Sequence, residues 1–278
     1  MVSSPASTVS VIHSLGLKGG KPFGFPLVCL NGARGMEIRP SGMKYPLHDN
    51  AAQTTPTGDV SPTEVVGSLR FVELFHEPVP QNVAVKALGL AKELRLVTNY
   101  YIGHEIHAQP KEESHFNLTQ RYTELTGTQI VHCDDDYGAL LKQGLPSKLV
   151  VLCDSSELDC VCSKLKEALE GQANVVRGSP PFFVEVLNKD VNKGRGLELM
   201  CKRLGVTPEE AIAFGDGDND KEFLGVAGRG IAMKNARDAV KEVADEVTEW
   251  TNAQVSHLAS CTEQNSSSAH SIDYSFFL

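Results

Sequence analysis

Three aspartates lie close together in a glycine-rich turn, in the segment Gly215-Asp-Gly-Asp-Asn-Asp220. The apolar residues Ala211 to Phe214 precede this turn and predict a short buried strand. Because open α/β sheets bind ligands at the carboxyl ends of their strands, the turn stands where a ligand would bind. Carboxylates this close repel one another unless a cation neutralises them, and oxygen ligands suit Mg²⁺. The turn is therefore a candidate metal site, although a solvated Asp/Asn/Gly turn has the same composition.

A second candidate for chemistry is Lys193, which lies in Val-Asn-Lys193-Gly-Arg-Gly upstream of the acidic turn. At the start of a helix, its ammonium group could reach a phosphate held by a metal and stabilise charge during phosphoryl transfer. Taken alone, an exposed lysine is the more common meaning of such a residue. The presence of the acidic turn in the same chain favours the phosphate-binding interpretation of Lys193 and the metal-binding interpretation of the turn.

The elements that would position these residues alternate between strand and helix, which predicts an α/β architecture. Leu27 to Leu30 predicts a buried strand that ends in the turn residues Asn31-Gly32. Thr207 begins a predicted capping box, and Gly205 ends the helix before it. The other predicted strands are Leu96 to Tyr101, Ser147 to Cys153, Phe182 to Leu187 and Gly230 to Met233, and the other predicted helices are Pro80 to Leu96, Leu158 to Leu169 with Asp154 or Ser155 as its cap, Leu197 to Leu204, and one that opens at Asn235.

Length and charge limit the classes of protein. A chain of 278 residues forms one large domain or two ordinary ones. The net charge of -9 argues against a nucleic-acid binder, which needs a basic face. No run approaches the roughly 18 apolar residues of a membrane span, and the first residues lack the pattern of a secretory signal. The seven scattered cysteines predict reduced thiols in a cytoplasmic protein.

The order of these features closely resembles the C-terminal half of the Cof-type phosphatases of the haloacid dehalogenase (HAD) superfamily. The resemblance rests on Lys193-Gly194, the acidic turn, Ala227 to Met233, Asn235-Ala236 and Ala244-Asp245, and on Asn31-Gly32-Ala33, which is similar to the family's hinge between core and cap. It covers roughly Ser10 to Asn252. It implies an HAD-like parallel Rossmannoid core with an inserted α/β cap domain.

The resemblance also implies a division of the chain. Residues 1–33 would be an N-terminal remnant of the core, and residues 34–186 the cap, with a loop insertion at 49–63. Residues 187–252 would complete the core, and residues 253–278 would form a flexible tail.

Residue roles follow from the same resemblance. Asp216 and Asp220 would serve the Mg²⁺ site, Lys193 would stabilise the phosphate, and Asn219 and Asn31 would belong to the substrate and phosphate loop. The implied partner is a small phosphorylated metabolite, commonly a sugar phosphate. The cap would select it, and its cations Arg121, Lys148 and Arg177 could contact an anion or simply face solvent.

The family's nucleophile lies in an N-terminal D-x-D-G-T, whose first aspartate attacks phosphorus while the second acts as acid and base. Residues 1–31 contain no aspartate. We therefore expect the nucleophile strand and the next core strand to be missing, with the following helix beginning near Met1 and ending at Leu15-Gly16-Leu17. The strands Leu27 to Leu30 and Ala211 to Phe214 would then flank a two-strand gap, and the isolated chain would be poorly stable.

We next ask whether another aspartate of the chain could replace the missing nucleophile. Asp134-Asp135-Asp136 follows an apolar segment and superficially resembles D-x-D, but it falls inside the implied cap, where a solvated acidic loop is the usual meaning. Two hypotheses stay open. The chain is either a Mg²⁺-dependent phosphatase of small phosphate esters, inactive as given because the nucleophile is absent, or a non-catalytic module that binds phosphate esters or a protein.

Overall fold

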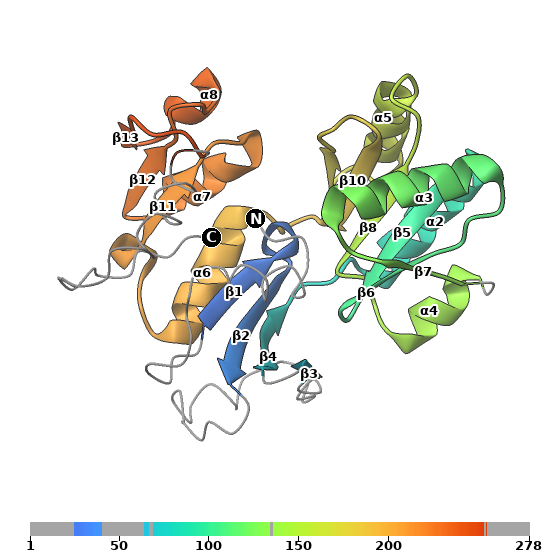
Figure 1. The fold of residues 1–278 in the computed structure, drawn as a ribbon, viewed down its shortest axis with the longest axis horizontal. Coiled ribbons are helices and arrows are strands. Elements are labelled where there is room, and N and C mark those ends of the chain that lie inside the picture. Colours follow the sequence, from blue (N-terminus) through green and yellow to red (C-terminus); the bar gives the residue numbers. More distant parts are fainter. Residues whose placement is uncertain (1–24, 41–63, 67–68, 134–135, 253, 255–278) are drawn as a thin grey trace. The chain divides into compact units, whose positions relative to one another are not determined.

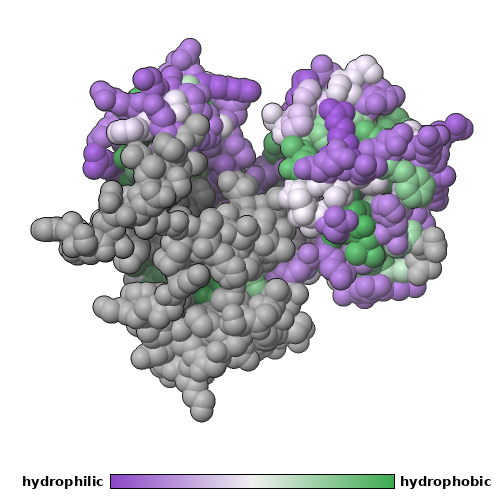
Figure 2. All heavy atoms as spheres, viewed as in Figure 1, coloured by the Kyte–Doolittle hydropathy of each residue, from purple (hydrophilic) through white to green (hydrophobic). Residues whose placement is uncertain are grey.

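The computed structural model of the protein describes residues 25–40, 64–66, 69–133, 136–252 and 254. These residues form two compact units. Figure 1 shows their helices and strands, with colours that follow the sequence from the N-terminus to the C-terminus. The first unit contains the described residues up to Phe75 and from Asn192 onward, and the second runs from His76 to Val191. On the face seen in Figure 2, hydrophilic side chains cover much of the described surface of each unit.

The first unit holds two separate sheets. In one, β1 pairs antiparallel with β2, β3 pairs antiparallel with β4, and the strand order is β1-β2-β4-β3. In the other, β11, β12 and β13 run parallel in that order. The elements are β1 (Phe25–Cys29), η1 (Leu30–Gly32), β2 (Arg34–Pro40), β3 (Glu64–Val66), β4 (Leu69–His76), α6 (Lys193–Leu204), η3 (Pro208–Glu210), β11 (Ile212–Gly215), η4 (Asp218–Asp220), α7 (Lys221–Val226), β12 (Arg229–Ala232), α8 (Asp238–Lys241) and β13 (Glu246–Val247).

Helix α6 contacts both sheets of this unit. It packs against β1, β2 and η1 and also against α7, η3 and η4. Its apolar face joins the buried core of the parallel sheet, where Leu197 belongs to the same cluster as Phe223 of α7 and Val240 of α8. The spacing of apolar residues that predicted this helix is the 3.6-residue period of a half-buried helix, and Gly205 ends it in the left-handed conformation, as predicted.

The second unit has one mixed sheet of order β7-β6-β5-β8-β10-β9. Helices α2 and α5 cover one face, where Tyr100, Leu149 and Val151 belong to the same buried cluster as the helix residues Val83 and Leu165. The elements are α2 (Gln81–Glu93), β5 (Val97–Ile102), β6 (Glu105–Ala108), α3 (Glu113–Thr126), β7 (Ile130–His132), α4 (Tyr137–Gln143), β8 (Lys148–Leu152), α5 (Leu158–Ala168), β9 (Ala173–Arg177) and β10 (Phe183–Asn188).

The structure corrects two expectations about the core. Residues 34–75 do not belong with the cap, because the turn at η1 reverses the chain and lays β2 beside β1, with Val28 opposite Gly35. The boundaries of the second unit therefore fall at His76 and Val191 instead of residues 34 and 186. The strand β1 also lies in an antiparallel sheet, so the parallel arrangement is confirmed only for β11 to β13. Among the described residues, β1 and β11 belong to different sheets, and the expected two-strand gap between them stays a prediction.

Several local predictions can be compared with the structure. The capping box at Thr207 is confirmed, although it opens only the three-residue helix η3. Asp154 and Ser155 do not cap α5; its N-cap is Glu157, whose amide donates to the Asp154 carbonyl in a preceding turn. The helix expected from Asn235 begins at Asp238. The loop at 49–63, the segment before Phe25 and the tail after Gln254 lie outside the described residues.

Cysteines 29, 133, 153, 160, 162 and 201 are free thiols. In the described ranges, none of the helices combines the length and the apolar character that crossing a bilayer requires.

Candidate active site in the first unit

The acidic turn follows β11 at its carboxyl end, as predicted, and one of its own side chains fixes its shape. The carboxylate of Asp220 accepts hydrogen bonds from the backbone amides of Asp216 at 3.0 Å and Gly217 at 2.8 Å. Asp220 is buried, with 6% of its surface exposed. Gly215 has no room for a side chain here, because a Cβ would lie 2.5 Å from the Cβ of Asp220. The glycines of the motif therefore allow the turn to close on this carboxylate.

Lys193 reaches the same carboxylate from α6. Its ammonium donates a hydrogen bond to Asp220 Oδ1. The helix begins at this lysine because Asn192 is its N-cap and accepts the amide of Arg195 at 2.8 Å. The predicted meeting of Lys193 with the acidic turn is thus present in the structure, and Asn192, which the sequence reasoning did not single out, positions it.

The two remaining aspartates of the turn differ in their partners. Asp218 is half exposed and forms ion pairs with Lys221 at 3.2 Å and Arg237 at 2.5 Å. The hydrogen bond from Lys221 is the largest of the causes that lower the pKa of this carboxyl, and Arg237 adds to it. Asp216 instead accepts a hydrogen bond at 3.2 Å from the neutral side-chain amide of Asn235. Among the described residues, Asp216 is therefore the aspartate of this turn that forms no ion pair with a lysine or arginine.

The residues fit a divalent cation in part. Within the described ranges, no three acidic, histidine or cysteine side chains cluster closely enough to hold a metal ion by themselves. Mg²⁺ commonly takes one or two protein carboxylates and fills its other positions with water and phosphate oxygens. Asp216 can supply one such oxygen, whereas the carboxylate of Asp220 already holds Lys193 and two amides. The geometry favours Asp216 as the ligand and Asp220 as a residue that positions the turn.

Asn31 and Asn219 complete the predicted set. The side chain of Asn219 donates to Asn31 Oδ1 at 3.4 Å, which brings η1 beside the acidic turn. Leu30, Asn31 and Gly32 all have positive φ angles, of 56°, 59° and 100°. Gly32 packs on the start of α6, where a Cβ would lie only 2.1 Å from the carbonyl oxygen of Asn192. This close approach places Asn31 next to the turn.

The other charged candidates have structural partners in the second unit. Asp136 is the N-cap of α4 and accepts the amide of Gly138 at 3.3 Å, while Asp134 and Asp135 lie outside the described residues. Lys148 is buried in an ion pair with Glu185 at 2.5 Å. Arg121 stacks over the ring of Phe182 at 4.0 Å, and Arg177 pairs with Asp159 on the surface. Each of the three cations thus has a partner within its own unit.

Sequence reasoning missed the groups that hold the site in place. Asn235 was noted as a helix start and as part of the family pattern but was given no role in the site, yet it is the partner of Asp216. Lys221 and Arg237 were not noted, although they hold Asp218. Asn235 follows β12, the strand next to β11, so its position after a neighbouring parallel strand was a usable signal. Arg237 carried no such signal.

A comparison with protein-family models matches residues 70–255, well over half of the chain, to the haloacid dehalogenase-like hydrolases. The chain belongs to this family. Membership in the HAD superfamily, predicted from the residues around the acidic turn, is thereby confirmed.

Individual HAD relatives show the same likeness. The chain is 44% identical over 73 residues to a phosphoglycolate phosphatase of Methanopyrus kandleri, which covers 26% of this chain and 32% of that protein. In structure it is similar to a haloacid dehalogenase-like hydrolase from Bacteroides thetaiotaomicron, with a TM-score of 0.56 and 30% identity over 68% of this chain and 69% of the other. It also has the fold of the HAD subclass IIB sugar phosphatase BT4131, with a TM-score of 0.57 and 18% identity over 94% and 91% of the two chains. The matches to curated relatives span less than two thirds of those proteins' own length.

Proposed function

We propose that this HAD protein is a Mg²⁺-dependent phosphatase of small phosphate esters, of the sugar-phosphate type. The observation that carries the proposal is the contact between Lys193 and the turn of Asp216 to Asp220. A phosphate ester carries negative charge that increases on its oxygens as the bond to phosphorus breaks. This chemistry requires an ammonium group beside a carboxylate that can bind a metal, and Lys193 of α6 lies beside the turn that carries Asp216.

Each residue has a separate task in this proposal. Asp216 would hold the metal ion, which neutralises charge on the phosphoryl oxygens when bound. Asp220 would keep Lys193 and the turn in place, and Lys193 would face the phosphate. Asn31 and Asn219 would contribute amide groups at the mouth of the same site. The similarity in fold to BT4131, which is a sugar phosphatase, supports a sugar phosphate as the substrate class.

We further propose that the 278 residues alone do not turn over substrate. The sequence contains no D-x-D-G-T segment, and among the described residues no three acidic, histidine or cysteine side chains form a group that could hold a metal ion. The same observation favours the alternative function, a non-catalytic module that binds phosphate esters. An in-frame D-x-D-G-T encoded upstream of Met1 would favour the phosphatase over the module.

The experiment separates binding from turnover. With Mg²⁺ present, the chain should bind inorganic phosphate in titration calorimetry and should not hydrolyse p-nitrophenyl phosphate. Asp216→Asn should abolish the Mg²⁺ dependence of binding, because it removes the ligand charge. Asp218→Asn is the matched control, since its carboxylate in the same turn is held by Arg237 and Lys221. Binding that still depends on Mg²⁺ in Asp216→Asn would contradict the metal assignment. Hydrolysis that Asp216→Asn abolishes would contradict the proposed absence of a nucleophile.

A further inference from the structure

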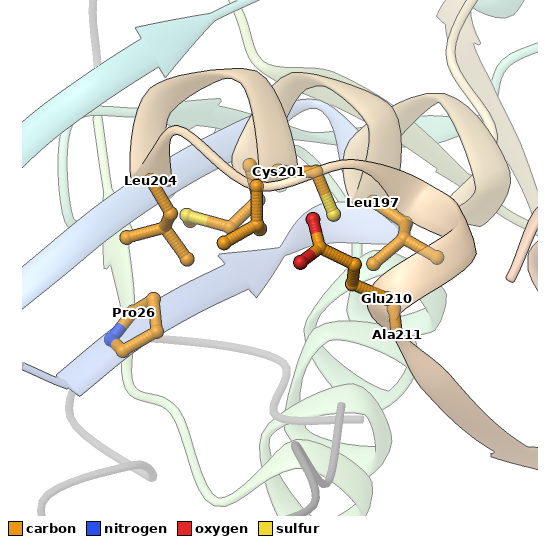
Figure 3. A pocket seen from close by; sticks show the side chains of 8 residues that line it. Pro26, Leu197, Cys201, Leu204, Glu210 and Ala211 are labelled. Atoms are coloured by element: carbon orange, nitrogen blue, oxygen red, sulfur yellow. The ribbon is translucent and has the colours of Figure 1, made fainter. Parts of the chain in front are cut away.

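An apolar groove beside α6 in the first unit is separate from the polar groups of the acidic turn (Figure 3). Figure 3 shows Leu204 and Cys201 projecting from α6 into the space above Pro26 of β1. The one charged residue of its lining is Glu210, and none of the lining residues donates a hydrogen bond to Asp216. The groups that position Asp216 therefore come from the residues around the acidic turn itself.

Asn235 lies in a turn whose backbone is held on both sides. The amide of Met233 donates a hydrogen bond of 2.9 Å to the carbonyl oxygen of Gly215, where the acidic turn begins. The amide of Lys234 donates a hydrogen bond of 3.0 Å to the carbonyl oxygen of Trp250, in the segment after β13. Backbone hydrogen bonds to both neighbouring segments therefore hold Asn235 beside the acidic turn.

The side-chain amide of Asn235 has two partners that determine which way it faces. Its Oδ1 accepts the backbone amide of Asn252 at 3.2 Å, and its Nδ2 donates to Asp216 Oδ2 at 3.2 Å. A backbone amide can only donate, and an ionised carboxylate can only accept. The reversed orientation would place two donors together at Asn252 and two acceptors together at Asp216. Asn235 therefore presents its amino group to the Asp216 carboxylate.

This hydrogen bond makes the two oxygens of Asp216 unequal. Oδ2 is held by Asn235, whereas Oδ1 accepts no hydrogen bond from a described residue. Mg²⁺ holds oxygen ligands in an octahedron at about 2.0–2.1 Å, whereas Ca²⁺ takes roughly six to eight oxygens and can bind both oxygens of one carboxylate. A carboxylate with one oxygen already engaged suits the smaller ion.

We propose that Asn235 is a positioning residue that makes Asp216 a one-oxygen ligand and so favours Mg²⁺ over Ca²⁺ at this site. The inference rests on the proposed function, which assigns the metal ion to Asp216. With Oδ2 on the Asn235 amide, Oδ1 is left for the cation, and Ca²⁺ must break that hydrogen bond before it can bind both oxygens. Hydrogen bonds to ligating carboxylates also strengthen metal binding, because they hold the ligand in one orientation. The Asn252 amide supports this role, since it holds the Asn235 side chain.

The main test titrates the full chain with MgCl₂ and, separately, with CaCl₂, and follows the backbone amide signal of Gly217 by NMR. Asp216→Asn should abolish the response to both ions. Asn235→Leu is close in size to the original residue and removes the donor. It should weaken Mg²⁺ binding about fivefold, the size expected for one hydrogen bond, and should not weaken Ca²⁺ binding. The preference for Mg²⁺ should therefore fall by the same factor.

A second pair of variants separates positioning from folding. Asn252→Pro removes the amide that holds Asn235 but leaves the amino group of Asn235 in place. Asn252→Ala keeps that amide and is the matched control. Proline suits this position, because Thr251 and Gln254 form the reciprocal hydrogen bonds of a helix start around it. Asn252→Pro should weaken Mg²⁺ binding about twofold or more, and Asn252→Ala should bind both ions as the unaltered chain does.

The outcomes distinguish this inference from the proposed function. Unchanged affinities in Asn235→Leu would overturn the inference and leave Asp216 as the metal ligand. Equal losses of Mg²⁺ and Ca²⁺ binding would also overturn it, because a purely structural role lowers both. If Mg²⁺ does not move the Gly217 signal of the unaltered chain, the inference and the metal assignment both fail. If Asn235→Leu does not fold, equal affinities in Asn252→Pro and Asn252→Ala would overturn the inference instead.

Discussion

The Asp220 carboxylate joins helix α6 to the acidic turn, because it accepts the ammonium of Lys193 together with the amides of Asp216 and Gly217. Three donors from two elements thus converge on one buried side chain. Two of the three carboxylates of this turn are thus paired with cations of the chain itself: Asp220 with Lys193, and Asp218 with Lys221 and Arg237.

Removing that carboxylate should destabilise the first unit. Asp220→Ala leaves the ammonium of Lys193 partly buried without its ion-pair partner, and breaking such a pair costs about 3–5 kcal/mol. Asp218→Ala, whose pairs are half exposed, should cost less than ~1 kcal/mol. Urea unfolding of the two variants measures the difference. Similar losses in both would show that Asp220 does not hold the turn.

The buried ion pair of the second unit gives an independent prediction. Lys148 and Glu185 lie on neighbouring strands with side chains 6% and 11% exposed. Lys148→Met should lower the free energy of unfolding by about 3 kcal/mol, because Glu185 stays buried without its cation. The double variant Lys148→Met/Glu185→Leu should recover most of the loss. The surface pair of Arg177 and Asp159 is the control, and Arg177→Met should change stability by about 0.5 kcal/mol or less.

Gly32 should tolerate no side chain. Gly32→Ala combines a φ angle of 100° with a Cβ only 2.1 Å from the Asn192 carbonyl oxygen, so the turn at η1 must move. Gly205→Ala has a similar φ angle of 72° but open space around its Cβ, so only the backbone strain of about 1 kcal/mol remains. Thermal unfolding should therefore show a clearly larger drop in Tm for Gly32→Ala. Equal drops would mean that the contact with Asn192 is not maintained.

Stability should fall at alkaline pH through Cys153. Burial raises the pKa of this thiol from 9.0 to about 11, with smaller contributions from Glu157 and Asp154. Between these values the unfolded chain loses the proton and the folded chain keeps it, so the unfolded state gains stability as pH rises. Each such proton contributes a slope of up to ~1.4 kcal/mol per pH unit. Urea unfolding from pH 8 to 11 should show a shallower fall for Cys153→Ala, and an unchanged slope would exclude this thiol as a source.

The sequence predicted the parts of the fold in which local pattern and packing agree. The helix from Leu197 to Leu204, its end at Gly205 and the strand before the acidic turn have strong periodic or capping signals, and each is present. The family resemblance also predicted Lys193 beside the acidic turn, but it did not predict the contact of Lys193 with Asp220. Their partner Asn235 was not recognised, since its role depends on which strands are neighbours.

The sequence did not predict where β2 belongs. Arg34 to Pro40 was assigned to the cap because it follows the Asn31-Gly32 turn, but the chain reverses there and forms an antiparallel pair. A turn with three consecutive positive φ angles, one of them at Leu30, has no clear signature in residue types. Its conformation is determined by packing against α6, which is a long-range contact that composition does not reveal.

Helix α6 contacts elements of both sheets of the first unit, and the site contains two kinds of contact. One is a buried ion pair and the other is a long hydrogen bond between two amides. Lys193 and Asp220 connect α6 with the turn beside it, whereas Asn31 of η1 and Asn219 of η4 are joined by a single amide hydrogen bond of 3.4 Å. A small rotation of the antiparallel sheet about the helix axis would widen the distance between the two asparagines while the lysine stayed on its carboxylate. The opening of the site could thus vary with the sheet's orientation while its charged centre kept a constant geometry.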